Sequence, residues 1–149
     1  MSISTGVCPV YENAFKFSIV GTSGTASDMK SVADMDNFSL SIDGNVEEWK
    51  PLEQQGWTRN QLTGKGMTIT ITGKRNVGDD GNDYIAGLAT KTGQDCATKF
   101  EWTFPDGSTL TGNCTINVTN INLGGESTAM APLEFEVRVD GKPTFTAAS

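Results

Sequence analysis

The chain contains no histidine among its 149 residues. Histidine is the commonest general base in catalysis and the commonest protein ligand of metals, so the usual building block of both kinds of site is missing. The Gly-x-Ser-x-Gly elbow of hydrolases is also absent, and Gly64-Lys65-Gly66 lacks the spacing of a phosphate-binding loop. We therefore expect a protein that is not an enzyme and that needs no cofactor or metal.

Cysteine and long apolar runs are scarce as well. Cys8, Cys96 and Cys114 form no close pair, which argues against a disulfide scaffold or a zinc site. We expect reduced thiols, as in a protein made in a cytoplasm. The first residues lack the layout of a signal peptide, and no apolar run approaches the length of about 20 residues that a membrane span needs. We expect no membrane contact.

Positive charge is in short supply. The chain has 11 basic residues against 18 acidic ones, which gives a net charge of −7. Tight binding to nucleic acid needs Lys and Arg to displace the condensed counterions, so this composition argues against it. It does not exclude nucleic acid that passes nearby without being held.

The dominant pattern that is present is a period of two, in which apolar residues alternate with polar ones. This pattern is typical of a strand with one buried and one polar face. It covers residues 15–19, 38–42, 67–71, 100–104 and 133–139, with a weaker example at 114–121. The length suits one domain, residues 1–149. The sequence predicts an all-β antiparallel fold, a β-sandwich or a partly closed barrel.

Other segments predict connections between these strands. Pro105-Asp106-Gly107-Ser108 predicts a turn, and therefore a hairpin over 100–116. Asp140-Gly141-Lys142-Pro143 predicts a second turn. One short helix is expected over 82–90, because an acidic start precedes apolar residues at helical spacing. The Gly-, Ser- and Thr-rich segment 21–34 predicts a mobile surface loop.

Residues 43–66 form a connection far longer than the 2–5 residues or so of a typical hairpin loop. The segment carries large apolar groups together with acids, and these residues are Val46, Glu47, Glu48, Trp49, Leu52, Trp57 and Leu62. A connection with so many apolar groups is not expected to stay free in water. Two interpretations stay open: the segment folds back on its own domain, or it packs against a neighbour.

Three groups of residues could carry chemistry, and each has a simpler interpretation. The pairs Glu47-Glu48 and Glu134/Glu136 could act in acid–base catalysis, but Glu134 and Glu136 alternate with apolar residues and so belong to a polar sheet face. The acidic run 79–83 could attract calcium, yet a turn that caps the following helix is favoured. Large aromatics such as Trp49 and Trp57 are more often packing or interface anchors than a platform for sugars.

Several motifs, taken in order, resemble the major tail (tail tube) proteins of long-tailed phages and prophages. The resemblance covers the chain from about Asn37 to the end. The motifs are Asp43-Gly44-Asn45-Val46-Glu47-Glu48-Trp49-Lys50-Pro51-Leu52, Gly56-Trp57, Thr63-Gly64-Lys65, Gly73-Lys74-Arg75-Asn76-Val77-Gly78-Asp79, Gly81-Asn82-Asp83-Tyr84-Ile85-Ala86-Gly87-Leu88, Phe104-Pro105-Asp106-Gly107, Asn117-Val118-Thr119-Asn120, Ala131-Pro132-Leu133-Glu134-Phe135-Glu136-Val137 and Asp140-Gly141-Lys142-Pro143.

The resemblance implies a β-sandwich or partly closed barrel with a flanking helix, assembled as hexameric rings that stack into a tube. The long connection would reach a neighbouring subunit or ring. Inner sheets would line a lumen through which DNA travels, and a tape-measure protein would lie inside during assembly. Tail-terminator and distal-tail or baseplate proteins would bind the ends. The expected location is the virion tail, assembled in the cytoplasm of a host bacterium.

The residues leave two points open. Glu134 and Glu136 are candidates for the lumen wall because they share one strand face with Arg138, but an outward-facing surface is an equal alternative. Two other functions also remain: a carbohydrate- or protein-binding β-sandwich module that uses Trp49 and Trp57, and another virion component such as a capsid decoration protein.

Overall fold

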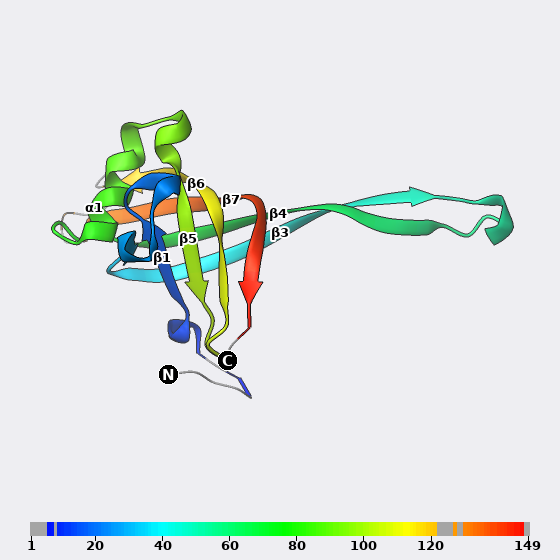
Figure 1. Ribbon diagram of the computed structural model, residues 1–149, viewed down its shortest axis with the longest axis horizontal. Helices are drawn as coiled ribbons and strands as arrows, with labels where there is room; N and C mark the ends of the chain where they lie inside the picture. Colours follow the sequence, from blue (N-terminus) through cyan, green and yellow to red (C-terminus); the bar gives the residue numbers. More distant parts are fainter. Residues whose placement is uncertain (1–5, 8, 122–126, 128–129, 148–149) are drawn as a thin grey trace.

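The structure, a computed structural model, describes the chain apart from residues 1–5, 8, 122–126, 128–129 and 148–149. In the described part, seven antiparallel strands form one sheet in the order β2-β1-β5-β6-β7-β4-β3. The strands are β1 (Ala14–Ser18), β2 (Met29–Ser31), β3 (Met35–Trp49), β4 (Arg59–Lys74), β5 (Ala97–Thr103), β6 (Thr109–Ile121) and β7 (Pro132–Thr146). The sheet curls strongly but is not closed into a barrel (Figure 1). The all-β antiparallel class is confirmed.

The core lies on the inner face of the curled sheet. Strands β4 and β7 supply its centre, where Ile69, Phe135 and Val137 have no exposed surface, and β1 adds Phe17. The rings of Phe17 and Phe135 meet edge to face, with centroids 5.8 Å apart. Burying a side chain of this size contributes about 1.5–3 kcal/mol. The alternation that predicted the strands therefore also gives the core.

The two ends of the sheet approach each other without a shared hydrogen bond. Phe15 on β1 and Phe38 on β3 pack edge to face with ring centroids 4.9 Å apart, and both rings contact Trp102 on β5. Strands β2 and β3 are nevertheless the outermost strands of the sheet order. Aromatic contacts thus join β1 to β3 where no backbone hydrogen bonds do, and we call this junction the seam.

The helix α1 (Asp80–Gly87) lies at one end of the sheet (Figure 1). The Asp79 side chain accepts a hydrogen bond from the Asn82 backbone N–H at 3.0 Å, which makes it the cap of the helix. Ile85 and Leu88 are buried, as their helical spacing predicts, although Leu88 belongs to a 3-10 turn that follows the helix. The acidic run is therefore a helix start.

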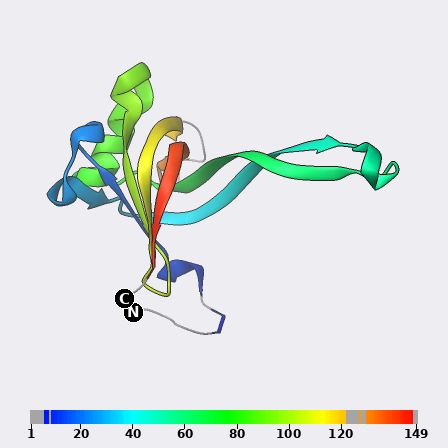
Figure 2. The same cartoon turned by 45° about the vertical axis from the view of Figure 1, so that its right-hand side comes forward.

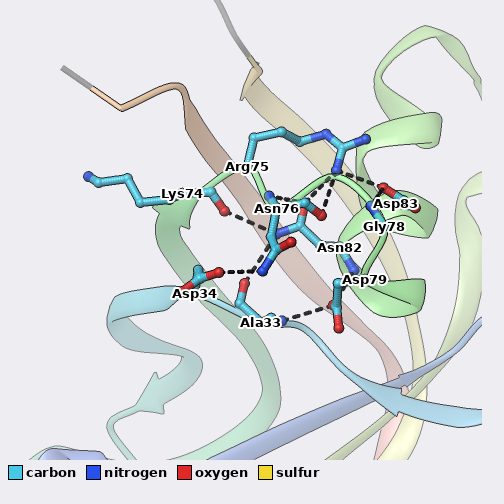
Figure 3. A network of polar contacts seen from close by, with 9 residues as sticks. All are labelled: Ala33, Asp34, Lys74, Arg75, Asn76, Gly78, Asp79, Asn82 and Asp83. Atoms are coloured by element: carbon cyan, nitrogen blue, oxygen red, sulfur yellow. Dashed lines mark hydrogen bonds and ion pairs between the residues drawn. The ribbon is translucent and has the colours of Figure 1, made fainter. Parts of the chain in front are cut away.

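A polar clasp joins α1 to the ends of β2 and β4 (Figure 3). The side chain of Asn82 is fully buried and accepts hydrogen bonds from Arg75 Nη1 at 2.8 Å and from the Asn76 N–H at 3.1 Å. Its amide donates to the carbonyl oxygens of Ala33 and Lys74. Four partners on one buried amide fix the segment that leads into β3.

Two expected connections differ from the structure. Residues 140–143 do not end a strand: β7 runs through them, with Thr111↔Thr144 and Asn113↔Asp140 as the flanking pairs. The chain bulges here, with Gly141 at φ 84°. Because β4 pairs with β7 only as far as Arg138, Pro143 does not need an N–H on that side. Within 21–34, Met29–Ser31 forms β2 and pairs with β1, so this segment is not wholly a loop.

The predicted hairpin over 100–116 is confirmed by the pairing of β5 with β6. Cys96 and Cys114 are free and buried, whereas Cys8 lies outside the described residues. Burial raises the pKa of the Cys114 thiol to about 12, so this side chain is inert at neutral pH. No helix in the described part of the chain has the length and apolarity to span a bilayer.

Candidate assembly surfaces

Residues 43–66 form a long projecting hairpin, which we call the arm (Figures 1 and 2). Strands β3 and β4 pair continuously out to Trp49↔Arg59, so most of the expected loop is strand. Strand β7, the other neighbour of β4 in the sheet, pairs with β4 only from Thr68 to Lys74. Beyond that point the arm is a two-stranded ribbon, and no strand in the described part of the chain pairs with either of its outer edges. Such a ribbon is marginally stable in water unless something packs against it.

The arm does not fold back onto its own domain. Every arm residue except the half-buried Pro51 is exposed, and Leu52 and Trp57 at its tip are 95% and 77% exposed. Val46, Trp49 and Leu62 are about half exposed. Glu47 and Glu48 are exposed as well, opposite Gln61 and Asn60. Of the two interpretations left open by the sequence, packing inward is therefore wrong.

An apolar stripe continues the core face outward along the arm. Leu40 pairs with the buried Ile69, Ile42 follows two residues later, and Val46 pairs with Leu62. Leu62 lies over Gly44, where an added Cβ would be only 2.9 Å from Leu62 Cδ1, so a larger residue at position 44 would displace the Leu62 side chain. The stripe reaches the arm without a break in apolar character, yet nothing in the described chain covers it.

The exposed apolar area of this region is large. With about 150–250 Å² for a fully exposed large side chain, the exposed fractions add up to on the order of 800 Å². The contributing residues are Leu40, Ile42, Val46, Trp49, Leu52, Trp57 and Leu62. One side of a standard protein–protein interface buries about 800 Å², and the largest apolar patch of an ordinary monomer is about 300–600 Å². The total is therefore of interface size, but it is divided between the two faces of the ribbon, because Trp49 lies three residues from Val46 on the same strand.

The tip of the arm is an ordered knob rather than a simple turn. It contains the 3-10 turn η4 (Leu52–Gln54), followed by Gln55 and Gly56 in the left-handed conformation at φ 55° and 93°. The Trp57 N–H donates to the Gln54 carbonyl at 3.1 Å. This backbone holds Leu52 and Trp57 outward together.

A cleft of about 520 Å³ lies at the seam between β1 and β3. Its floor is apolar and includes Phe17, Ile71 and Phe135, and its rim includes Val10 and Tyr11 of the 3-10 turn η1 (Val10–Glu12). The rim residues are 63% and 83% exposed. The size is that of a pocket that takes a drug-sized group.

The rim of the cleft is held in place by Asn13. Its side-chain oxygen accepts a hydrogen bond from Trp102 Nε1 at 2.9 Å, and its amide donates to the Val10 carbonyl at 3.0 Å. One side chain therefore ties the η1 turn to the aromatic cluster of the core. The sequence did not predict this cleft, since η1 has no periodic pattern and the resemblance begins after it.

Glu134 and Glu136 lie on the outer, polar face of the sheet. The residues beside them on the neighbouring strands β4 and β6 are also polar, and we call this surface the polar lattice. Glu134 pairs with Thr72 and Asn120. Glu136 pairs with Thr70 and Asn117. Asn120 Nδ2 donates to Glu134 at 2.7 Å, and Asn117 Nδ2 to Glu136 at 3.1 Å.

Arg138 pairs with Glu136 at 3.4 Å on the same face. The structure thus places the two glutamates together, on the face opposite the core.

A scan against protein-family models and a search of curated protein sequences found no match for the chain. Solved structures do match. A chain from the tail of an empty gene transfer agent particle, solved with C6 symmetry, has a TM-score of 0.71 at 18% identity and covers 95% of this chain and 100% of that one. This chain has the fold of tail components.

Two further matches support this fold assignment. The sheath/tube terminator of an extracellular contractile injection system has a TM-score of 0.63 at 12% identity, over 97% of this chain and 100% of that one. The tube-terminating cap of the anti-feeding prophage has a TM-score of 0.60 at 14% identity, over 99% and 97%. All these neighbours are structural parts of tail-type particles rather than enzymes.

Proposed function

We propose that this chain is the repeating subunit of a tail tube, in which copies form hexameric rings that stack around a passage for DNA. The observation that carries the proposal is the arm, which presents an interface-sized apolar surface and two unpaired edges on a fold shared with tail components. A contact between different surfaces of identical copies closes into a ring or extends into a tube.

The polar lattice around Glu134 and Glu136 is the surface best suited to the lumen. Its three strands present Thr, Asn and Glu and no apolar residue at the register positions of these two glutamates. One carboxylate about 10 Å from a phosphate repels it by only about 0.4 kcal/mol in water, and salt reduces this further. A repeated ring of carboxylates adds these small repulsions, so that DNA passes without adhering.

The proposal implies particular partners and a location. The main partner is the chain itself. A tape-measure protein would occupy the lumen during assembly, and terminator and distal-tail or baseplate proteins would bind the tube ends. The tube would be assembled in the cytoplasm of a host bacterium and would end up in a virion tail.

Negative-stain microscopy of the concentrated protein tests the proposal. We expect rings and stacked tubes of uniform diameter. A chain that remains strictly monomeric at every concentration and salt would contradict it.

A tube terminator is the second candidate, because two of the structural neighbours terminate or cap a tube. The same micrographs separate the two functions. A tube subunit stacks into particles of increasing length, whereas a terminator gives single rings that do not extend.

The lumen assignment has a test of its own. Replacing Glu134→Lys and Glu136→Lys should make assembled tubes retain double-stranded DNA, since the wall would attract phosphate instead of repelling it. The matched control is Asp80→Lys with Asp95→Lys, which changes the net charge equally at two exposed positions elsewhere. If the control retains as much DNA as the first variant, the face around Glu134 does not line the lumen.

A further inference from the structure

The chain carries two unpartnered apolar features of opposite shape. The knob at the arm tip is convex, with Leu52 and Trp57 turned outward, and the cleft at the seam is concave, with Val10 and Tyr11 exposed on its rim. Each feature would be costly to leave in water at about 25 cal/mol per Å² of apolar surface. A single contact in which a knob fills a cleft would remove both apolar surfaces from water.

The knob cannot fill the cleft of its own chain. From Ile42 to Trp49 the arm extends for about 23 Å at about 3.3 Å per residue. Both views show the tip far from β1 (Figures 1 and 2). The arm is also continuous with β3 and β4, whose pairing sets its direction away from the seam. The knob must therefore meet something outside its own chain.

We propose that the knob of one copy docks in the seam cleft of a second copy. This inference rests on the proposed function, and it names the acceptor of the arm. A second copy is the occupant that matches in number, because every copy that brings a knob also brings a seam cleft. A contact of two different surfaces covers every knob and every cleft in a closed ring, and all but those at the ends of an extended assembly.

Size supports this pairing. A cleft of about 520 Å³ is within the range of roughly 300–1,000 Å³ that takes a drug-sized group, so it accommodates two large side chains such as Leu52 and Trp57. The knob and the stripe together offer on the order of 800 Å², about one side of a standard interface. The cleft alone would bury too little. The stripe must therefore lie along the receiving copy while the knob enters the cleft.

Local hydrogen bonds hold the knob and the cleft rim themselves in shape, even though the ribbon that carries the knob is marginally stable alone. The knob is fixed by its 3-10 turn and by the Trp57 to Gln54 hydrogen bond, and the cleft rim is fixed by Asn13. Binding between preorganised surfaces avoids much of the entropy that ordering would cost. A Trp anchor entering an apolar pocket is also the typical centre of an energetic hot spot.

Cross-linking between two differently tagged copies tests the inference. One copy carries Leu52→Cys and the other Tyr11→Cys, both in a Cys8→Ser background, while the buried Cys96 and Cys114 stay as they are. The copies are mixed, allowed to assemble and treated with a short bifunctional maleimide. We expect a cross-linked pair that contains both tags, formed at least tenfold more in the assembled fraction than in the monomer.

The control pairs Leu52→Cys with Val77→Cys. Val77 is 80% exposed, close to the 83% of Tyr11, but it does not line the cleft. All three positions are exposed, so circular dichroism should show the same fold in each variant. Tubes that form without the 52–11 cross-link, or with an equal 52–77 product, would overturn the docking while leaving the tube intact. A wild-type chain that never assembles would overturn both.

Discussion

The curled sheet and the arm share strands β3 and β4, but the two regions differ in what covers these strands. Within the sheet, alternate residues of β4 are buried, as with Ile69 and Ile71, and each strand except the outermost has two paired neighbours. In the arm, the continuation of β4 and β3 has no buried residue and one pairing partner. The sheet is stabilised by the chain itself. The arm has apolar groups that only another molecule can cover.

This contrast predicts that substitutions in the sheet lower the stability of the fold, whereas substitutions in the arm prevent assembly and leave the stability unchanged. The largest loss of stability should come from the core. Phe135→Ala removes a ring with no exposed surface and should cost about 3–5 kcal/mol in the free energy of unfolding. Phe145→Ala is the control, because that ring is 61% exposed. Urea unfolding measures both, and equal losses would show that burial does not set the stability of the sheet.

The clasp at α1 should give the next largest effect. Asn82→Ala should cost about 2–4 kcal/mol, since a buried polar group that loses its partner costs about 1–3 kcal/mol. The affected groups are the guanidinium of Arg75 and three backbone groups. Asn60→Ala on the exposed arm should stay within about 0.5 kcal/mol in the same unfolding experiment. A neutral Asn82→Ala would mean that the clasp is not a source of stability.

The pH dependence of stability should show a smaller effect from the same clasp. The hydrogen bond from Arg75, at 2.8 Å, and that from the Gly78 N–H lower the pKa of Asp83. The stability that this carboxylate contributes is therefore present above its unfolded pKa of about 3.9 and is lost as the pH falls through the lower folded value.

Asp83→Asn should thus reduce stability at pH 6 and approach the wild type as the medium becomes more acidic. Unfolding at a series of pH values measures this. A difference that is constant with pH, or that grows on acidification, would contradict the sign.

The smallest effect on stability should come from the arm. Trp49→Ser with Trp57→Ser should leave the free energy of unfolding within about 0.5 kcal/mol, because neither side chain contacts the core cluster. The same variant should lose polymerisation, as sedimentation velocity would show. A collapse of the unfolding temperature would mean that the arm stabilises the sheet, and the contrast between the two regions would fail.

The sequence predicted the strands of the core and the helix, though not β2, because their signals are local. Phe135 and Val137 alternate with glutamates, and Asp79 stands where a cap belongs. The exposure of Trp49 and Trp57 could not be predicted from the sequence. It depends on the point at which β4 stops pairing with β7, and this point is set by contacts between residues far apart in the chain. The cleft was missed for the same reason: it needs Phe15 and Phe38, distant in sequence, to meet at the seam. The bulge at Gly141 was misread as a turn, because both use the same residue types.

The central claim is that the arm lacks cover in one copy and gains it from others. Amide hydrogen exchange of residues 43–66, compared between dilute monomer and the assembled fraction, tests this most directly. We predict rapid exchange in the monomer, since the arm's outer edges are unpaired and its ribbon is marginal, and strong protection on assembly. Strong protection in the monomer, or equally fast exchange in both states, would contradict the claim.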